Sequence, residues 1–479
     1  MNRVYLVPLI VACALFMENL DSTVLATSLP AIARSLGVNP LTLNLAITSY
    51  LLSLAVFIPV SGWVADRFGA RRVFRLAIAV FVLGSIGCGL SQSLWQLVVA
   101  RVVQGAGGAM MIPVGRLVIL RSVAKSQLVR AMAYLTVPAL LGPILGPPLG
   151  GFITTYLDWR WIFWINLPIG LAGIWLATRF IPDLKEELVP RLDARGFLLS
   201  ALALAGLVFG FEALGRDLLP EWLMAVLLGG GALAAGLYLL HARSAAAPLI
   251  DLGLLALPTF RASVVGGLLF RVGIGALPFL LPLMLQLGFG YSPLESGLTT
   301  FVAAIGALAM KFAAAPILRR FGFKPVLIGN AVVCGFFLGV IALFTPATPE
   351  AVMLGLLLVG GFFRSLQFTA LNALAYAQVE RPRMSAATSL AAMVQQLALS
   401  IGVGLGALAL HLTVTAAGRA VPEAQDFAVA FVLVGALAAL SALAFLGLPQ
   451  DAGSEVSGHA KLREGVAANA ASAKDVAAE

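Results

Sequence analysis

Residues 62–72 read Gly-Trp-Val-Ala-Asp-Arg-Phe-Gly-Ala-Arg-Arg, a short charged stretch between two long uncharged ones. Ser35–Ala65 before it and Leu76–Ala100 after it contain no Asp, Glu, Lys or Arg. A helix needs about 20 predominantly apolar residues to cross the hydrocarbon core of a bilayer, and both stretches are long enough. Residues 62–72 are therefore predicted to be a loop at a membrane surface, between two transmembrane helices.

The same alternation of apolar stretches and short charged loops continues to about residue 447 of the 479-residue chain. Hydrophobic residues make up 60% of the chain and charged residues only 11%, whereas soluble proteins carry about 25% charged residues. This composition predicts an all-α polytopic membrane protein. We expect fourteen transmembrane helices, at residues 4–32, 44–65, 73–91, 95–121, 129–154, 160–181, 196–213, 222–243, 261–287, 293–316, 325–345, 350–377, 384–413 and 425–447.

Lys and Arg are distributed unevenly between the two sets of loops. The loops that follow even-numbered helices hold eighteen of them, and those that follow odd-numbered helices hold four. Because cytoplasmic loops carry the excess of positive charge, we predict that both termini are cytoplasmic. The net charge of +9 is spread over these loops and forms no basic patch, so we expect no nucleic-acid partner.

The sequence carries no signal of an enzyme or of a metal site. Cys13, Cys88 and Cys334 lie inside separate apolar stretches, which argues against a disulfide framework and against a metal cluster. No glycine-rich nucleotide loop and no Ser–His–Asp set is present. We therefore expect no catalytic residues, no cofactor, no bound metal and no direct use of ATP.

Two landmarks recur at one offset along the chain. Asn39-Pro40-Leu41 opens the second predicted helix, and Ser292-Pro293-Leu294 opens the tenth, 253 residues later. The charged loop at 62–72 recurs, at the same offset, as Arg319-Arg320-Phe321-Gly322 within residues 315–324. The chain therefore looks like two six-helix repeats, a transporter signature in which the substrate site lies near the membrane midplane between the halves.

The repeat divides the chain into four parts. We expect an N-terminal six-helix bundle at 1–181 and two linker transmembrane helices with their loops at 182–260. A C-terminal six-helix bundle should follow at 261–447. Residues 448–479 are too polar to bury and are predicted to form a disordered cytoplasmic tail.

Several motifs in order along the chain resemble those of a known family. Residues 62–72 match the Gly-x-x-x-Asp-Arg-x-Gly-x-Arg-Arg pattern of the major facilitator superfamily. Four further segments resemble its fourteen-helix drug/proton antiporters, the EmrB/QacA type of multidrug efflux transporter: Leu20–Pro30, Arg101–Gly108, Gly142–Gly151 and Trp159–Pro168.

The resemblance implies the major facilitator fold, with two six-helix bundles and two inserted linker helices. It also implies a proton-coupled antiporter that exports drugs or small amphipathic metabolites across a bacterial inner membrane by alternating access, driven by the proton gradient. The expected partners are protons, a small-molecule substrate and the bilayer. A periplasmic adaptor is compatible with this branch of the family, and the chain is expected to function as a monomer.

Ionisable residues inside membrane spans cost free energy and usually have a function. Glu18 and Asp21 are three residues apart on one helix and so share a face. Two close carboxylates in a low dielectric do not both ionise cheaply, so one of them is expected to carry a proton. Arg101, at a similar depth in the fourth helix, is the predicted partner of Asp21. The alternative is that Arg101 merely neutralises one acid.

Two segments are predicted to act as conformational gates. In the fifth helix, glycines four residues apart form a side-chain-free stripe, and the prolines between them bend the helix. In the loop at 62–72, the family resemblance implies that the acid meets the start of the helix near Met384 and holds the cytoplasmic side shut. The predicted gate residues are Asp66, Arg67, Gly69, Arg71, Arg72, Gly142, Pro143, Gly146, Pro147 and Gly150.

Arg271 and Arg364 lie near mid-depth in the C-terminal half, which offers no mid-membrane acid to pair with them. They either donate to backbone carbonyls in packing roles, or they help a cavity accept a carboxylate, a phosphate or a neutral polar substrate. Arg116 should contact substrate or the cytoplasmic gate, and Lys311 is expected to snorkel to the interface. Polar residues expected to line the cavity are Asn19, Tyr50, Gln104, Gln286, Gln367, Asn372, Gln395 and Gln396.

The alternatives are an importer and a membrane sensor. A proton-coupled symporter or facilitator could import an organic anion or a peptide, but the motif in the fifth helix is associated with exporters. The first helix also lacks the acid–x–x–acid–Arg cluster of fourteen-helix peptide transporters. A membrane sensor would explain neither the internal repeat nor the lack of a cytoplasmic signalling domain.

Overall fold

The computed structural model describes residues 3–122, 128–182, 191–213, 220–245, 248–380, 383–419 and 421–457, and all regular structure in these ranges is helical. The N-terminal half contains α1 (Arg3–Leu36), η1 (Pro40–Leu43), α2 (Asn44–Phe68), α3 (Ala70–Leu90), α4 (Leu94–Ser122), α5 (Leu128–Tyr156), α6 (Trp161–Trp164) and α7 (Asn166–Phe180). Next come α8 (Ala194–Ala213), α9 (Glu221–Ser244), η3 (Leu252–Ala256), α10 (Pro258–Arg261), η4 (Ala262–Gly266), α11 (Leu268–Gly275), α12 (Leu277–Leu283) and η5 (Met284–Gly288). The chain continues with α13 (Pro293–Phe321), α14 (Phe323–Val340), η6 (Ile341–Leu343), α15 (Glu350–Ala375), α16 (Met384–Ala416), η8 (Ala424–Asp426), α17 (Phe427–Phe445) and α18 (Ser454–Ser457).

The predicted class is confirmed. Within the described residues, thirteen helical segments are long and apolar enough to cross a membrane. The fourteenth expected span corresponds to α5, a helix of 29 residues. The chain is thus a multi-pass membrane protein of helices.

Two expected spans are not single regular helices. The span at 261–287 is divided into α10, η4, α11, α12 and η5, and both η4 and η5 are π-helical turns. Closely spaced glycines and the ring of Pro278 weaken the regular hydrogen-bond ladder there. The span at 160–181 breaks at Ile165 into α6 and α7, just before Asn166. The first break contains Ser263, the hydrogen-bond partner of Arg271, and the second precedes Asn166, which binds Asp21.

The turns support the repeat seen in the sequence. Gly37 and Gly290 have φ of 64° and 74°, and Gly69 and Gly322 have φ of 92° and 77°, so each pair is separated by the same 253 residues. A positive φ is strained for residues with a Cβ, so these turns need glycine. The two halves therefore repeat not only residues but also backbone conformations.

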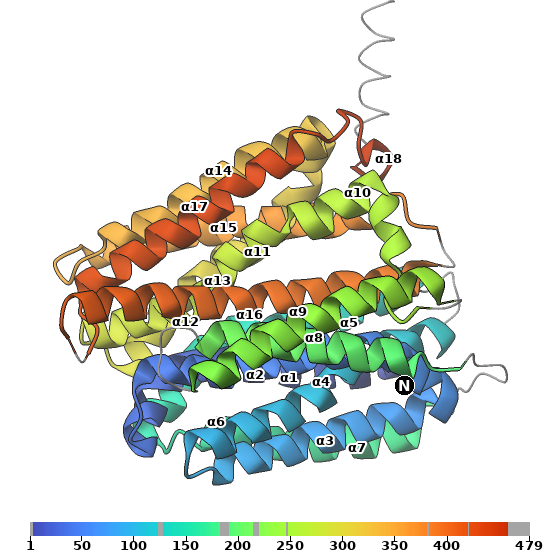
Figure 1. Cartoon of the computed structure of the whole chain (residues 1–479), viewed down its shortest axis with the longest axis horizontal. Helices are drawn as coiled ribbons and strands as arrows, with labels where there is room; N and C mark the ends of the chain where they lie inside the picture. Colours follow the sequence, from blue (N-terminus) through green and yellow to red (C-terminus); the bar gives the residue numbers. More distant parts are fainter. Residues whose placement is uncertain are drawn as a thin grey trace, which may run out of the picture.

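The helices form two bundles that pack side by side (Figure 1). In one bundle α1 packs on α5, and α4 packs on both α2 and α3; in the other α13 packs on α15 and α14 on α17. The pairs α5–α13 and α2–α16 join the bundles, and the α8–α9 hairpin lies against α2 and α16 at their junction.

The two ends of the molecule differ in how the bundles meet. We call the end that carries the Gly37 and Gly290 turns the Gly37 end, and the end that carries the Gly69 and Gly322 turns the Gly69 end. Three hydrogen bonds join the bundles toward the Gly37 end: Gln286 Nε2 to the Thr27 carbonyl (2.8 Å), Leu294 N to Thr155 Oγ1 (3.2 Å) and Ser400 Oγ to the Thr48 carbonyl (3.5 Å). Toward the Gly69 end, marked by the N-terminus in Figure 1, α14 and α17 diverge from α3 and α7.

Candidate functional site

The expected pairing of Asp21 with Arg101 is confirmed. Arg101 Nη1 on α4 donates to Asp21 Oδ2 on α1 at 2.5 Å, and the two residues are only 1% and 3% exposed. Removing a single member of a buried ion pair leaves an uncompensated charge in a low dielectric. The two side chains therefore stabilise each other inside the N-terminal bundle.

Groups from three helices, α2, α4 and α7, surround this pair. Asp21 Oδ1 accepts from Gln104 Nε2 at 2.8 Å and from Asn166 Nδ2 at 2.9 Å. Arg101 Nε donates to the Ala46 carbonyl at 3.0 Å, and its guanidinium lies 4.1 Å from the centre of the Tyr50 ring. Both side chains of the pair are thus held by further hydrogen bonds, and the guanidinium also by an aromatic ring.

Glycines let the helices come close enough to build this cluster. A Cβ on Gly84 of α3 would lie 2.5 Å from the backbone nitrogen of Gln104, and one on Gly105 of α4 would lie 2.6 Å from the Cβ of Ser53. Small residues at helix interfaces permit such close backbone approach in membranes. The glycines that follow Gln104 thus have a packing role beside their motif.

Glu18 lies in a different environment from Asp21. It is buried and lines a polar cavity of about 260 Å³ between the two bundles. The opposite wall comes from α15 and α16 and includes Asn372, Gln395 and Gln396, three of the polar residues predicted for the cavity. Thr388 lies in the first turns of α16, so this cavity is displaced toward the Gly69 end.

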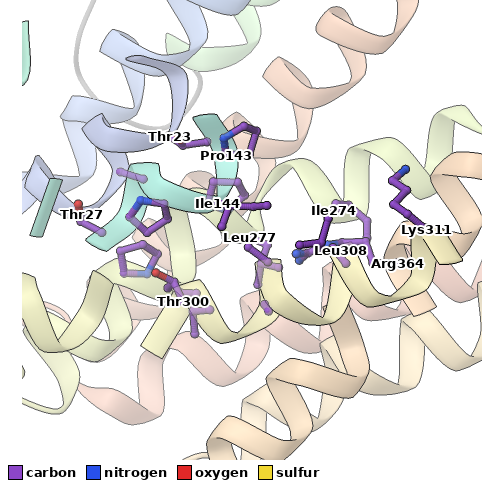
Figure 2. A pocket seen from close by; sticks show the side chains of 18 residues that line it. Thr23, Thr27, Pro143, Ile144, Ile274, Leu277, Thr300, Leu308, Lys311 and Arg364 are labelled. Atoms are coloured by element: carbon purple, nitrogen blue, oxygen red, sulfur yellow. The ribbon is translucent and has the colours of Figure 1, made fainter. Parts of the chain in front are cut away.

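A second, mostly apolar cavity of about 320 Å³ lies between α1 and α5 on one side and α11, α12, α13 and α15 on the other. Figure 2 shows Thr23, Thr27 and Pro143 toward one end of it and Lys311 and Arg364 toward the other. The charged end lies on the C-terminal bundle. Arg364 was a predicted substrate residue, whereas Lys311 was expected only to snorkel.

The glycine stripe of α5 packs within the N-terminal bundle. A Cβ on Gly142, Gly146 or Gly150 would meet α1 at Leu20, Thr23 or Val24. This leaves the neighbouring face of α5 free to contact the other bundle.

That second face of α5 meets α13. A Cβ on Gly151 would strike the Pro293 carbonyl, and one on Gly297 would strike the Pro147 carbonyl. The motif in α5 therefore contributes to two helix interfaces, α1–α5 and α5–α13, and Pro147 lies in the second, between the bundles.

The charged loop at 62–72 forms the tight turn at the Gly69 end. Asp66 and Arg67 lie in the last turn of α2, Gly69 forms the turn, and Arg72 is exposed at the start of α3. Arg71 Nη1 donates to the Ile181 carbonyl at the end of α7 at 3.5 Å. The contact of Asp66 with the start of α16 stays a prediction.

Among the described side chains, the other predicted substrate residues lie outside both cavities. Arg271 donates to the Ser263 carbonyl at 2.7 Å, which fits the packing role that the sequence left open. Gln367 is buried against Asn330 and the Leu327 carbonyl. Gln286 joins the bundles, as described above, and Asn19 Nδ2 donates to the Leu15 carbonyl on its own helix. The side chain of Arg116 lies outside the described part of the chain.

Two residues that complete the acid–base cluster were missed as site residues. Asn166 is fully buried and follows the break between α6 and α7, and Ser85 Oγ accepts from both Gln104 and Asn166. The sequence does single out Asn166, because an amide side chain inside an apolar span needs a hydrogen-bond partner. Sequence spacing alone gave no reason to place it beside Asp21.

The comparisons with known proteins agree on one family. The family model described as "Major Facilitator Superfamily" matches residues 11–276 and 263–474. The chain is 38% identical over 452 residues to the "Putative multidrug resistance protein MdtD" of Salmonella paratyphi B, covering 92% of this chain and 94% of that protein. The protein of the same name from Salmonella typhimurium matches with the same identity and coverage.

Solved structures resemble the fold at low sequence identity. A D-xylose–proton symporter matches with a TM-score of 0.67 and 15% identity over 94% of this chain and 99% of that chain. A bacterial homologue of the human lysosomal transporter Spinster, in an inward-facing conformation, matches with a TM-score of 0.65 and 15% identity over 93% and 96%. The human organic anion transporter MFSD10 gives 0.60 and 16% over 93% and 100%. At these identities the likeness shows the fold alone.

Proposed function

Since this chain belongs to the Major Facilitator Superfamily and is a multi-pass membrane transporter, we propose that it exports amphipathic drugs or metabolites in exchange for protons. The name of the Salmonella relatives supports efflux as the direction. The observation that carries the coupling is the buried ion pair of Asp21 and Arg101.

Protonation of Asp21 would remove the negative charge that holds Arg101. A neutral carboxyl group still accepts hydrogen bonds, but it no longer offsets a buried guanidinium. The contacts of Arg101 with the Ala46 carbonyl and with Tyr50 would remain and draw it toward α2. A proton on Asp21 therefore changes the preferred packing of α1 against α4.

Helix α1 links the proton site to the substrate cavity. Successive residues of a helix are about 100° apart, so Asp21 and Thr23 point about 200° apart, to opposite sides. Asp21 faces α4, whereas Thr23 and Thr27 line the apolar cavity beside α5. A movement of α1 that follows protonation is transmitted directly to the wall of that cavity.

Glu18 is placed to pass protons between the aqueous side and Asp21. It lies one turn from Asp21 toward the Gly69 end and lines the polar cavity there. The bundles are joined by hydrogen bonds toward the opposite end. We propose that this arrangement is the state closed at the Gly37 end, and that both termini, and hence the Gly69 end, are cytoplasmic.

Transport in proteoliposomes tests the proposal. The purified chain is reconstituted alone, a pH gradient is imposed, and flux of cationic, neutral and anionic compounds is measured with wild type and Asp21→Asn. We expect substrate to move against the proton flow, and Asp21→Asn to abolish the gradient-driven part. Glu350→Gln, which removes an exposed acid at the start of α15, is the matched control.

The same experiment separates the alternatives. Substrate flux that runs with the protons would support the symporter instead. Gradient-driven flux that survives in Asp21→Asn would exclude Asp21 as the coupling site. Because the chain is tested without other proteins, full activity would also show that neither an adaptor nor a further component is needed.

A further inference from the structure

We infer that the apolar cavity between α1, α5, α13 and α15 binds amphipathic organic anions, with a carboxylate or sulfonate held by Arg364 and Lys311. This inference rests on the proposed function as an exporter and names the substrate class of its cavity. Three observations support it: two cations line the cavity, the acids of the membrane domain lie elsewhere, and the walls are apolar.

Arg364 brings an uncompensated positive charge to the cavity. It lies in the middle of α15 and lines the cavity, and within the described residues it has no hydrogen-bond or ion-pair partner. Lys311 of α13 lines the same end, and its Nζ donates to Thr369 Oγ1 at 3.0 Å. A cation held in an apolar site without a counter-ion is costly, and an anionic ligand removes that cost.

The acids of the membrane domain do not neutralise this end. No Asp or Glu lines the apolar cavity among the described residues. Asp21 faces α4, where Arg101 already matches its charge, and Glu18 lines the other cavity. A cationic substrate would meet two positive charges here and no negative one.

Arg271 is the natural comparison, because it is the other arginine of this half at mid-depth. Its Nη1 donates to the buried Ser263 carbonyl in the π-helical turn η4, and it lines neither cavity. The two arginines of the C-terminal half are therefore not equivalent. Only Arg364 presents its charge to a space that a ligand can enter.

The walls of the cavity define the rest of the ligand. Ile274, Leu277 and Leu281 on one side and Pro143 and Pro147 on the other offer aliphatic surface, and the volume of about 320 Å³ suits one small molecule. The hydroxyls of the threonines lie at the end away from the cations (Figure 2). The predicted ligand has an apolar body with one anionic end, and the guanidinium can bind that end through two hydrogen bonds.

Binding of three probes that share one ring system tests the inference. The purified full chain in nanodiscs of zwitterionic lipid is titrated calorimetrically with 1-naphthaleneacetate, 1-naphthylmethanol and 1-naphthylmethylamine. We expect the anion to bind about tenfold more tightly than the alcohol or the amine, since one charge-assisted contact contributes on that order. Arg364→Gln should remove this preference, Arg364→Lys should restore part of it, and Lys311→Gln should weaken it by about threefold.

Arg319→Gln, an exposed cation near the end of α13, is the control and should change nothing. Equal binding of anion and alcohol, tighter binding of the amine, or an unchanged preference in Arg364→Gln would each overturn the inference. Loss of binding of all three probes in Arg364→Gln would reflect misfolding, so Arg364→Lys then decides: a restored anion preference supports the inference, and its absence overturns it. Because no pH gradient is used, failure of proton-coupled export leaves this result unaffected.

The anion could come from the bilayer or from water, and competition separates these sources. Displacement of 1-naphthaleneacetate by oleate at lower concentration than by benzoate would assign the site to membrane-derived amphiphiles. The reverse order would assign it to water-soluble carboxylates. Displacement by neither would overturn the inference.

Discussion

The ion pair of Asp21 and Arg101 leads to a quantitative prediction about folding stability. Asp21→Asn keeps the shape of the side chain but removes the charge that Arg101 contacts at 2.5 Å. Breaking one side of a buried pair costs about 3–5 kcal/mol. Arg101 would keep its contacts with Ala46, Gln104 and Tyr50, so we expect a loss near 3 kcal/mol. Arg101→Gln should cost a similar amount, because it leaves the carboxylate without its cation.

The double variant distinguishes an ion pair from two independent contributions. When both charges are removed, no uncompensated charge remains, so the double loss should be smaller than the sum of the single losses by about 2 kcal/mol. The free energies are measured by SDS-induced unfolding in bicelles, followed by helical circular dichroism, with Arg319→Gln as the exposed control. Additive losses, within about 0.5 kcal/mol, would refute the argument that the two charges depend on each other.

Three further outcomes follow from the structure. Gly146→Ala places a methyl group against Thr23 and should destabilise the α1–α5 seam by about 1–3 kcal/mol, whereas Gly355→Ala, with open space around it, should stabilise by up to about 1 kcal/mol; SDS unfolding compares the two. Burial raises the pKa of Asp193, but hydrogen bonds from the Gly196 and Leu249 amides and from His241 outweigh burial and lower it overall. The stabilising effect of Asp193 should therefore be complete above the unfolded pKa of about 3.9 and vanish as the pH falls through the lower folded pKa. Thermal denaturation of wild type and Asp193→Asn at several pH values checks this, and a stability difference that persisted in acid would contradict it. Gln286→Ala removes one hydrogen bond between the bundles, worth about 1 kcal/mol, and should raise the population open at the Gly37 end about fivefold, which distance measurements between spin labels on the two bundles would detect or refute.

The two acids of α1 show which part of the site follows from the sequence and which part depends on packing. Depth along a helix follows from counting residues, so the match of Asp21 with Arg101 could be predicted. The separation of Glu18 from that pair could not, because it depends on which neighbours each side chain meets. Only the packed bundles show that Asp21 has its own hydrogen-bond shell while Glu18 lines a cavity.

The two arginines of the C-terminal half make the same point. Both lie near mid-depth, and the sequence offered packing and ligand binding as equal alternatives for each. The contact of Arg271 with the Ser263 carbonyl in the π-helical turn η4, and the cavity beside Arg364, depend on helix breaks and tertiary contacts that no local pattern encodes.

By itself the sequence determined the membrane class, the spans, the repeat and the family. These properties depend on hydropathy, on charge in the loops and on turns that need glycine, all of which are local. The tertiary structure decided which face of each helix points to a partner, to a cavity or to lipid. The physical reason is that lipid is as apolar as a leucine side chain, so a buried face and a lipid-facing one carry similar residues, and only packing distinguishes them.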